Sequence, residues 1–402
     1  MVELLKIGLV FIGIIALMFM KVDLWISLLV TTLFLALLFH LPVMEVGWDL
    51  LSAALDEKTL LLVGALFTIV FFNNLLKETG RMNKILEGFK KLLKDIRVVV
   101  ALLPAIIGLM PIVGGALVSA PMVVEGSDQL KLSPERRTFI NYWFRHLWEY
   151  VLPTYPALLL AATLIGIPVR RLGWINLPLT PTAILSGTII GFWGVSKSVR
   201  EEGEELGTTS VWELFRNLFP LIFALVLVVG FKVELAYAFG LTILGMIVFS
   251  RVERQVVLTA LKQSFSLGLL LTVMAVMGFK RVLESSQAIS KVSAFLSGSG
   301  VPFWLIAILI PLIVGLMTGM TIAPIAIGFP ILIPLFQSDP NFLNYMMLAF
   351  ASGISGDLLS PFHLCLVLTR DYFKADLGGV YRLLWFPVAS ILIVGLLMSF
   401  VR

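Results

Sequence analysis

The stretch IPLIVGLMTGMTIAP, residues 310–324, decides the fold because it interrupts one of the most apolar parts of the chain. It carries two glycines, two prolines and two threonines where an uninterrupted membrane helix would carry Leu and Val. A second stretch, LPAIIGLMPIVGGAL at residues 103–117, repeats the pattern, so that Gly108 and Gly315 stand 207 residues apart. Two matching interruptions in one chain predict two structural repeats.

The composition of the chain places it in a membrane. Hydrophobic residues make up 59% of the 402 residues and charged residues 14%, against about 45–50% and about 25% in soluble domains. That leaves too little polar surface to coat a water-soluble globule, so we expect an all-α polytopic membrane protein with the lipid bilayer as a partner. The net charge of +5 indicates basic loops that face anionic lipid rather than a nucleic-acid partner.

Apolar runs divide the chain into two halves with the same order of elements. The first repeat, residues 1–200, has predicted spans at 4–20, 24–41, 59–77 and 180–198, with interrupted apolar blocks at 97–125 and 138–165. The second repeat, residues 211–402, has predicted spans at 213–231, 234–250, 263–283 and 382–400, with interrupted blocks at 302–336 and 342–370. The blocks 97–125 and 302–336 are too long for one crossing and too short for two, which favours re-entrant hairpins. Each repeat then has five crossings and one hairpin, or about ten crossings and two hairpins in all.

An odd number of crossings per repeat predicts that the second repeat is inverted relative to the first. Lys and Arg concentrate in the loops around 21–23, 77–97, 125–137, 197–213, 250–262 and 370–382, which predicts that these loops are cytoplasmic. Both termini are then expected outside, in a multi-pass protein of the inner (cytoplasmic) membrane. The lysine-rich segment 81–95 is predicted to be an interfacial amphipathic helix.

The tips of the two hairpins are the first predicted part of a binding site. Backbone that leaves the helix inside a bilayer is tolerated only where protein or a water-filled cavity covers it. Gly114 and Gly115 at the first tip, and Thr318, Gly319 and Thr321 at the second, are therefore predicted to bind substrate. Amide groups at a helix N-terminus suit an anion, and free carbonyls suit a cation. The alternative is that the small residues only let helices pack closely.

An acid four residues before a proline marks each of the two broken spans. Glu149 precedes Pro153, and Asp357 precedes Pro361. An ionised carboxylate inside a membrane is costly unless it is paired or hydrated, so both acids are predicted ion-coupling residues. Arg145 stands one helical turn before Glu149, and the alternative there is a purely structural i,i+4 ion pair.

Polar neighbours complete the predicted ion site around Asp357. Ser352 and Ser355 share its segment, and with no basic residue one turn away we expect a shell of hydroxyls and carbonyls that suits Na⁺ or H⁺. His146 and His363 lie in the same blocks and are predicted to carry protons, with hydrogen bonding to broken backbone as the alternative.

The remaining assignments concern solute, metal and cofactor. Thr154 and Ser360, which flank the two prolines, are predicted to bind substrate together with the hairpin tips. The sequence shows no His or Cys pair at metal-ligand spacing, so we expect no metal site beyond a possible Na⁺ near Asp357, and no cofactor.

With its two hairpins and two acid-plus-proline breaks, the chain resembles the ion transporter superfamily of secondary carriers, and looks like a member of an uncharacterised prokaryotic family within it. That superfamily includes gluconate permeases, citrate carriers and divalent anion:sodium symporters. The resemblance implies a homodimer in which early spans form a scaffold and the hairpins and broken helices move as an elevator. The tips read GLMPIVGG and GLMTGMT here, whereas members with known dicarboxylate substrates carry Ser-Asn-Thr.

Taken together, these features predict a secondary active transporter, not an enzyme, that couples Na⁺ or H⁺ to symport of a small anionic organic solute. The alternative is a cation/proton antiporter without an organic substrate, in which Glu149 and Asp357 exchange ions. A remote alternative is an intramembrane serine protease, because residues 353–356 read GISG and His363 is near in sequence. Such proteases bring the histidine from another helix.

Overall fold

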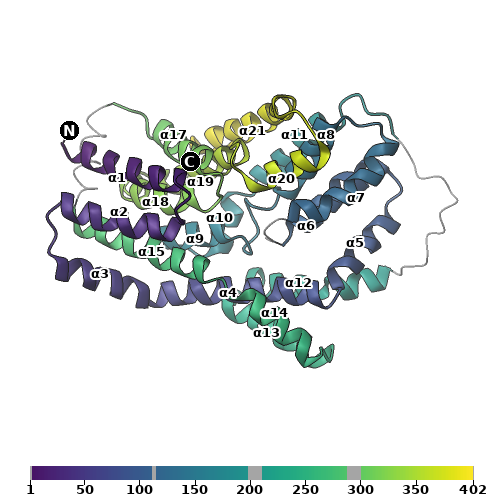
Figure 1. Ribbon diagram of the computed structural model, residues 1–402, viewed down its shortest axis with the longest axis horizontal. Coiled ribbons are helices and arrows are strands. Elements are labelled where there is room, and N and C mark those ends of the chain that lie inside the picture. The colour runs from purple at the N-terminus through teal and green to yellow at the C-terminus, as the bar shows by residue number, and fades with distance from the viewer. Residues whose placement is uncertain (1, 111–114, 198–210, 288–299, 402) are drawn as a thin grey trace.

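The computed structural model describes residues 2–110, 115–197, 211–287 and 300–401, which form helices and no β-strand (Figure 1). In chain order the helices are α1 (Val2–Phe19), α2 (Leu24–Leu38), α3 (Val43–Leu55), α4 (Glu57–Glu78), α5 (Arg81–Leu92), α6 (Ile96–Gly108), α7 (Gly115–Gln129), α8 (Pro134–Arg145), α9 (Pro156–Ile165), α10 (Val169–Ile175), α11 (Leu179–Phe192), α12 (Val211–Val229), α13 (Leu235–Phe249), α14 (Arg254–Ser264), α15 (Leu267–Ser285), α17 (Phe303–Thr318), α18 (Ala323–Phe336), α19 (Phe342–Leu358), α20 (Leu364–Phe373) and α21 (Leu377–Ser399).

The order of helices recurs along the chain. The helices α6 to α9 have counterparts in α17 to α20 that begin 207 or 208 residues later, as Ile96 and Phe303 do. Likewise α1 to α4 have counterparts in α12 to α15 that begin 209 to 211 residues later. Packing is reciprocal as well, because α4 packs on α13 and α14 while α15 packs on α2 and α3. A helix of each half therefore packs on the corresponding two helices of the other half.

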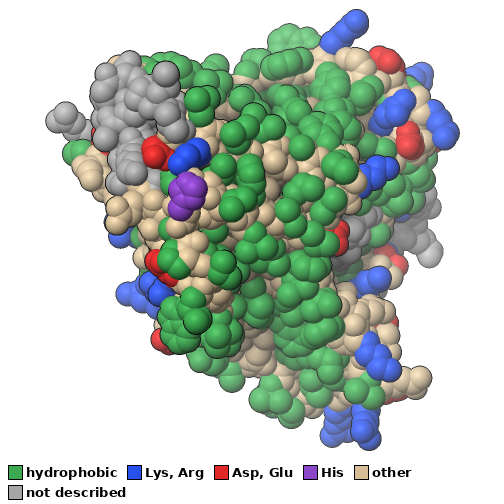
Figure 2. Space-filling model, turned by 60° about the vertical axis from the view of Figure 1, so that its left-hand side comes forward, with side chains coloured by type: hydrophobic (Ala, Val, Ile, Leu, Met, Phe, Trp, Pro, Cys, Tyr) green, Lys and Arg blue, Asp and Glu red, His purple; other side chains and the backbone are tan. Residues whose placement is uncertain are grey.

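Several helices are apolar enough for a bilayer. Among the described residues, α4, α12 and α21 are each long and apolar enough to cross a membrane. Two bent pairs pass the same test together, α9 with α10 at 104° and α14 with α15 at 43°. Apolar side chains cover much of the face shown in Figure 2, while Lys and Arg gather at its margins. The chain is thus a helical membrane protein.

The two predicted hairpins each appear as a pair of short apolar helices. In the first, α6 packs against α7, and in the second, α17 packs against α18. These helices contain 13, 15, 16 and 14 residues in chain order. At about 1.5 Å per residue none reaches the roughly 30 Å thickness of the hydrocarbon core. Each of the four helices taken singly is therefore shorter than the hydrocarbon core is thick.

The first hairpin begins at a charged cap. Asp95 is the N-cap of α6, and its carboxylate accepts a hydrogen bond from the backbone N–H of Arg97 at 3.0 Å. The guanidinium of Arg97 also donates to this carboxylate, at 2.9 Å for the Nη2–Oδ2 pair. Hydrogen bonds from Arg97 lower the pKa of Asp95, because they favour the ionised carboxylate. The carboxylate therefore stays charged at the helix N-terminus, where the helix dipole also favours a negative charge.

The amphipathic helix predicted at 81–95 is observed as α5, with Met82, Ile85 and Leu86 buried on one side. Two other short helices, α3 and α14, were not predicted from the sequence. Each precedes a longer apolar helix, α4 or α15, and mixes polar with apolar residues, so neither is recognisable as a membrane span by hydropathy. The span predicted at 180–198 is shorter than expected, because α11 ends at Phe192.

The broken spans are interrupted where the prolines stand. The first break covers residues 146–155, between α8 and α9, and the second covers 359–363, between α19 and α20. Glu149 and Asp357 nonetheless differ in backbone conformation. Glu149 lies in the turns after α8, whereas Asp357 lies in the last turn of α19. Matching sequence positions thus give two different local settings.

The repeated glycines bring hairpin helices into contact with the backbone of the broken spans. A Cβ on Gly315 would overlap the carbonyl oxygen of Gly353 and stand 2.7 Å from the amide nitrogen of Asp357. In the first half, a Cβ on Gly108 would overlap the carbonyl oxygen of Arg145. Gly108 and Gly315 are thus packing positions, whereas the residues predicted to bind substrate lie further along, at the two tips. Close packing by glycine places the hairpins directly against both breaks.

Candidate functional site

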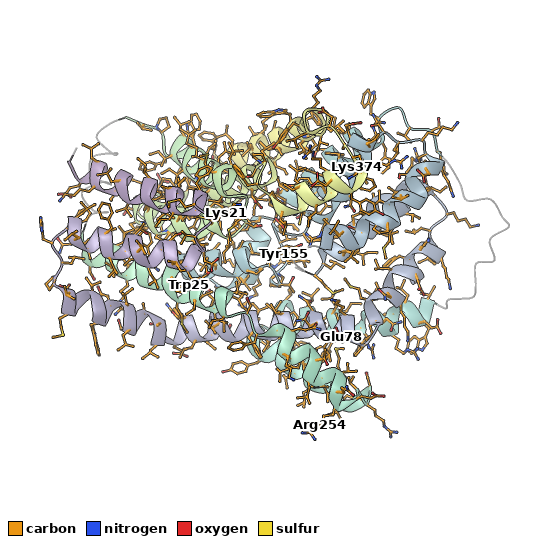
Figure 3. The ribbon with its side chains drawn as sticks, in the orientation of Figure 1. Lys21, Trp25, Glu78, Tyr155, Arg254 and Lys374 are labelled. Carbon is orange, nitrogen blue, oxygen red and sulfur yellow. The ribbon has the colours of Figure 1, made fainter. Side chains whose placement is uncertain are left out.

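The two breaks and the second hairpin tip meet near the middle of the molecule. Tyr155, at the end of the first break, is labelled near the centre of Figure 3. Its hydroxyl donates a hydrogen bond to the carbonyl oxygen of Gly108, so the first hairpin is tied to the first break. Across the two halves, α8 packs on α20, and α9 packs on α18. Residues from both halves therefore surround one buried centre.

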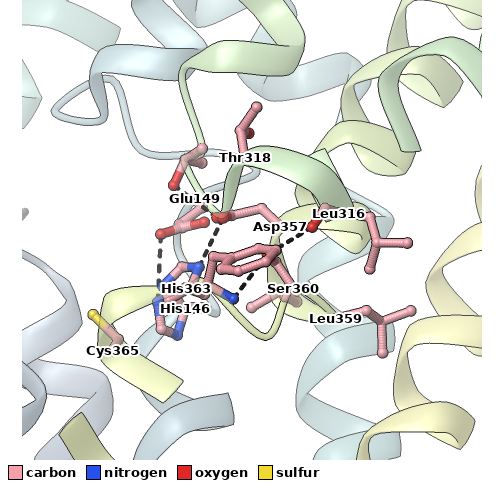
Figure 4. A network of polar contacts seen from close by, with 12 residues as sticks. His146, Glu149, Leu316, Thr318, Asp357, Leu359, Ser360, His363 and Cys365 are labelled. Carbon is pink, nitrogen blue, oxygen red and sulfur yellow. Dashed lines mark hydrogen bonds and ion pairs between the residues drawn. The ribbon is translucent and has the colours of Figure 1, made fainter. Parts of the chain in front are cut away.

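Asp357 forms the core of a buried polar network (Figure 4). Its side chain is fully buried, and one carboxylate oxygen, Oδ1, accepts a hydrogen bond from Nδ1 of His363 at 2.7 Å. The other oxygen, Oδ2, accepts from the hydroxyl of Thr321 at 3.0 Å. The sequence predicted only hydroxyls and carbonyls around Asp357, and this prediction was wrong, because the break folds back and brings His363 to the carboxylate. The network links the second hairpin tip to both sides of the second break.

Glu149 lies beside a histidine in the first break. Oε1 of Glu149 lies 4.0 Å from Nε2 of His146, and both side chains are buried. The i,i+4 arrangement with Arg145, the structural alternative for Glu149, requires one continuous helix, whereas α8 ends at Arg145 and Glu149 lies in the turns that follow. The ring of His146 is fixed by its other nitrogen, since Nδ1 lies 2.6 Å from the carbonyl oxygen of Tyr142.

Arg145 points toward the first hairpin. A Cβ on Gly115, the first residue of α7, would lie 2.6 Å from Nη2 of Arg145. Nη1 of the same guanidinium donates to Sγ of Cys365 at 3.5 Å. The side chain of Arg145 is buried, so a positive charge stands at the N-terminal end of α7 inside the molecule. Gly114, the other predicted binding residue of this tip, lies outside the described residues.

Two functional candidates were missed from the sequence. The ring of Tyr142 packs edge-on against both histidines, with centroid distances of 4.7 Å to His146 and 5.3 Å to His363. The two imidazole rings are themselves 5.1 Å apart. Cys365 joins them, since one ligand atom from each of His146, His363 and Cys365 lies within 4.8 Å of the others. A tyrosine one turn before His146 and a cysteine two residues after His363 were the available signals, and neither is specific alone.

The second hairpin tip is held against the second break. Gly319 has the left-handed conformation, with φ of 62°, and a Cβ there would lie 2.7 Å from the amide nitrogen of His363. The hydroxyl of Ser360 donates to the carbonyl oxygen of Leu316 at 2.7 Å. Thr318, by contrast, bonds within its own helix to Val314. Of the predicted tip residues, Thr321 hydrogen-bonds Asp357, and Gly319 allows the tip to approach the backbone of the second break.

The other predicted polar residues contribute less to the centre. Ser352 donates to the carbonyl oxygen of Leu348 one turn earlier in α19. The hydroxyls of Ser355 and Thr154 are buried and have no hydrogen-bond partner among the described residues. For the protease alternative, Nδ1 of His363 is bonded to Asp357 rather than to Ser355. A cavity of about 430 Å³ between α6, α8 and α11 is mostly apolar and includes no predicted site residue.

The site thus collects two carboxylates, two imidazoles, a guanidinium and a thiol in the interior of a membrane protein. Such groups are costly in an apolar interior, and they are retained where ions or polar solutes bind or pass. Comparison with protein families matches residues 4–401 to one family model, described as a protein of unknown function (DUF401). Comparison with curated proteins gives no match.

Proposed function

This chain is a member of the DUF401 family, and we propose that it is a secondary active transporter that couples Na⁺ or H⁺ to the movement of a small anionic organic solute. In this proposal the hairpins and broken helices form a transport domain that moves as an elevator. The early helices of each half form the scaffold, and the functional unit is a homodimer in the cytoplasmic membrane. The chain acts as a carrier and not as an enzyme.

One observation carries the proposal, namely the network of Asp357, His363 and Thr321. Asp357 and His363 are buried, Thr321 is partly buried, and together they join a hairpin tip to a helix break. A buried charge tolerated at such a break is typical of a coupling-ion site, since broken helices expose backbone groups at mid-membrane. We therefore assign the coupling charge to Asp357, with Thr321 and His363 as the groups that respond when an ion binds.

The anionic nature of the solute is inferred from Arg145. Its guanidinium stands beside Gly115 at the N-terminal end of α7, where the helix dipole adds a partial positive charge. A guanidinium at such a helix end favours carboxylate or phosphate groups. Thr154 in the first break is buried, its hydroxyl has no hydrogen-bond partner among the described residues, and we assign it to orient the same solute.

A second candidate function is cation/proton antiport without an organic solute. It is favoured by Glu149, whose Oε2 is buried without a hydrogen-bond partner among the described residues. A carboxylate that is only partly satisfied is suited to exchange one cation for another. Both candidates place ion exchange in the same centre, and they differ in whether a solute must travel with the ion.

Proteoliposomes separate the two candidates. Vesicles that contain the purified chain and a lumenal pH or sodium indicator are given an inward Na⁺ or H⁺ gradient and then a panel of small organic anions. The proposal predicts ion entry only when a transported anion is present, with protein-free vesicles as the control. If a counter-cation drives ion movement when no organic anion is present, the protein is an antiporter and the symport proposal is wrong. If no ion moved under any gradient, anion or counter-cation tested, both candidate functions would be contradicted.

The proposed orientation of the chain inverts one half relative to the other and places the lysine-rich loops in the cytoplasm. The recurrence of helix starts and the reciprocal packing of α4 and α15 support two related halves. For single cysteines in intact cells, we predict that Lys84→Cys in α5 is protected from an impermeant thiol reagent and that Arg171→Cys in α10 reacts. The unsubstituted chain, whose lone Cys365 is buried, gives the background. Labelling with the reverse pattern would overturn this orientation.

A further inference from the structure

We propose that His146, His363 and Cys365 form a binding site for a thiophilic divalent metal ion of the Zn²⁺ class. One ligand atom from each residue lies within 4.8 Å of the other two, in a buried centre where both halves of the chain meet. The inference goes beyond the proposed function, since it rests on ligand geometry and not on transport. It also differs from the sequence prediction, which found no metal-ligand spacing, because His146 and His363 are 217 residues apart and only folding brings them together.

The Nδ1 atoms of both imidazoles already have hydrogen-bond partners, which leaves Nε2 of each ring for a metal ion. Nδ1 of His146 faces a backbone carbonyl oxygen and Nδ1 of His363 faces a carboxylate oxygen, and these acceptors require Nδ1 to carry the proton. In the neutral rings Nε2 then holds the free lone pair. Histidine ligands in metal sites are usually fixed in this way, by donating the other ring N–H to a carbonyl or a carboxylate. Asp357 and the carbonyl of Tyr142 are the orienting groups here.

The thiol completes a set of nitrogen and sulfur donors. Sγ of Cys365 lies in the same cluster as the two imidazoles, and a cysteine binds metal as the thiolate, so the proton leaves the thiol when the ion binds. Imidazole and thiolate together suit Zn²⁺ and its neighbours among the transition metals, whereas Mg²⁺ and Ca²⁺ prefer oxygen. The donor set therefore selects a borderline or soft cation.

Glu149 supplies a fourth position. Its Oε1 lies 4.0 Å from Nε2 of His146, and its Oε2 is buried with no hydrogen-bond partner among the described residues. Zinc sites take four ligands at about 2.0–2.3 Å, so the three clustered donors must close in on the ion and the Glu149 carboxylate, which lies beside His146, must rotate to reach it. Such an ion would join α8 and α20, which come from different halves of the chain.

Cobalt(II) provides a direct test, because a Co²⁺–thiolate bond gives a near-ultraviolet charge-transfer band. The chain contains one cysteine, so any such band must come from Cys365. The test titrates Co²⁺ alone into the purified full chain in detergent, without a histidine tag, and then adds Zn²⁺ as competitor. We expect the band to saturate at one Co²⁺ per chain, with visible absorption of a tetrahedral site, and Zn²⁺ to abolish it.

Variants identify the ligands. Cys365→Ser should remove the charge-transfer band, and His146→Gln or His363→Gln should weaken Co²⁺ binding while the protein stays folded by its melting curve. Asp357→Asn, which loses the charge that orients His363, should weaken binding by about 10- to 100-fold. The control is His40→Asn, because His40 is the one remaining histidine and its φ of 54° is tolerated by Asn.

Wild-type protein alone decides the proposal even if a variant fails to fold. The metal-site proposal is wrong if folded wild-type protein shows no thiolate band at saturating Co²⁺. It is also wrong if the strength of the band is unchanged in both histidine variants. A wild-type chain that shows the cobalt band but transports no solute under any gradient tested would instead count against the proposed function alone, so the two failures remain distinguishable.

Discussion

Asp357→Asn is expected to abolish coupled transport while leaving the protein folded. The substitution keeps the shape of the side chain and an oxygen that accepts from Thr321 or His363, but it removes the charge at the centre of the network. Loss of an interaction with a buried charge is worth about 3 kcal/mol, so the initial rate of ion-driven solute uptake should fall by about 100-fold. Uptake in proteoliposomes and melting curves in detergent measure the two effects separately.

The matched control is the same chemical change at another buried acid. Asp49 in α3 is also largely buried, but it hydrogen-bonds Ser285 at 2.7 Å and lies outside the central network. Asp49→Asn should therefore transport at the wild-type rate. If Asp357→Asn moves solute normally with an unchanged dependence on Na⁺ and pH, the coupling charge is not on this residue.

Gly315→Ala is expected to destabilise the protein more than any surface change. The added methyl group would overlap the carbonyl oxygen of Gly353, which is backbone and cannot rotate away. Overpacking an ordinary core lowers the free energy of unfolding by about 1–3 kcal/mol. Because the added methyl group meets backbone of the facing helix, we expect a loss of at least about 3 kcal/mol here. Thermal unfolding in detergent should show a melting temperature lowered by several degrees, together with poor yield.

Gly240→Ala is the control for this prediction. Gly240 lies in α13, another apolar helix, and a Cβ there would meet no atom within 4 Å. Its melting temperature should be unchanged or slightly raised, since Ala favours helix over Gly. Equal melting temperatures for the two variants would show that α17 is not packed on α19 as closely as described.

Hydropathy and glycine placement were sufficient to predict the helical membrane class and the positions of most helices. The apolar runs predicted at 59–77 and 213–231 are observed as α4 and α12, and the breaks fall at Pro153 and Pro361. These features were predictable because they depend on local composition. Long apolar runs predict membrane helices, and prolines and glycines predict where those helices are interrupted. Short mixed helices such as α3 lack such a signal.

The contacts inside the centre were not predictable, because they depend on where chain segments turn. Arg145 and Glu149 have the spacing of a helical ion pair, yet α8 ends between them and the arginine faces the first hairpin instead. Cys365 was uninformative as a lone cysteine, and only folding brings it beside His146 from the other half of the chain. Residue types at the site were therefore recognisable from the sequence, whereas their partners were not.

The central claim is that the ion and the solute move together, and a reversal measurement in proteoliposomes tests it most directly. At each of several outward gradients of a transported anion, the opposing inward Na⁺ or H⁺ gradient is varied until the net solute flux is zero. Coupled transport predicts that the logarithm of the ion gradient at this reversal point rises in proportion to the logarithm of the solute gradient. A solute flux that always follows its own gradient, whatever the ion gradient, would contradict the account.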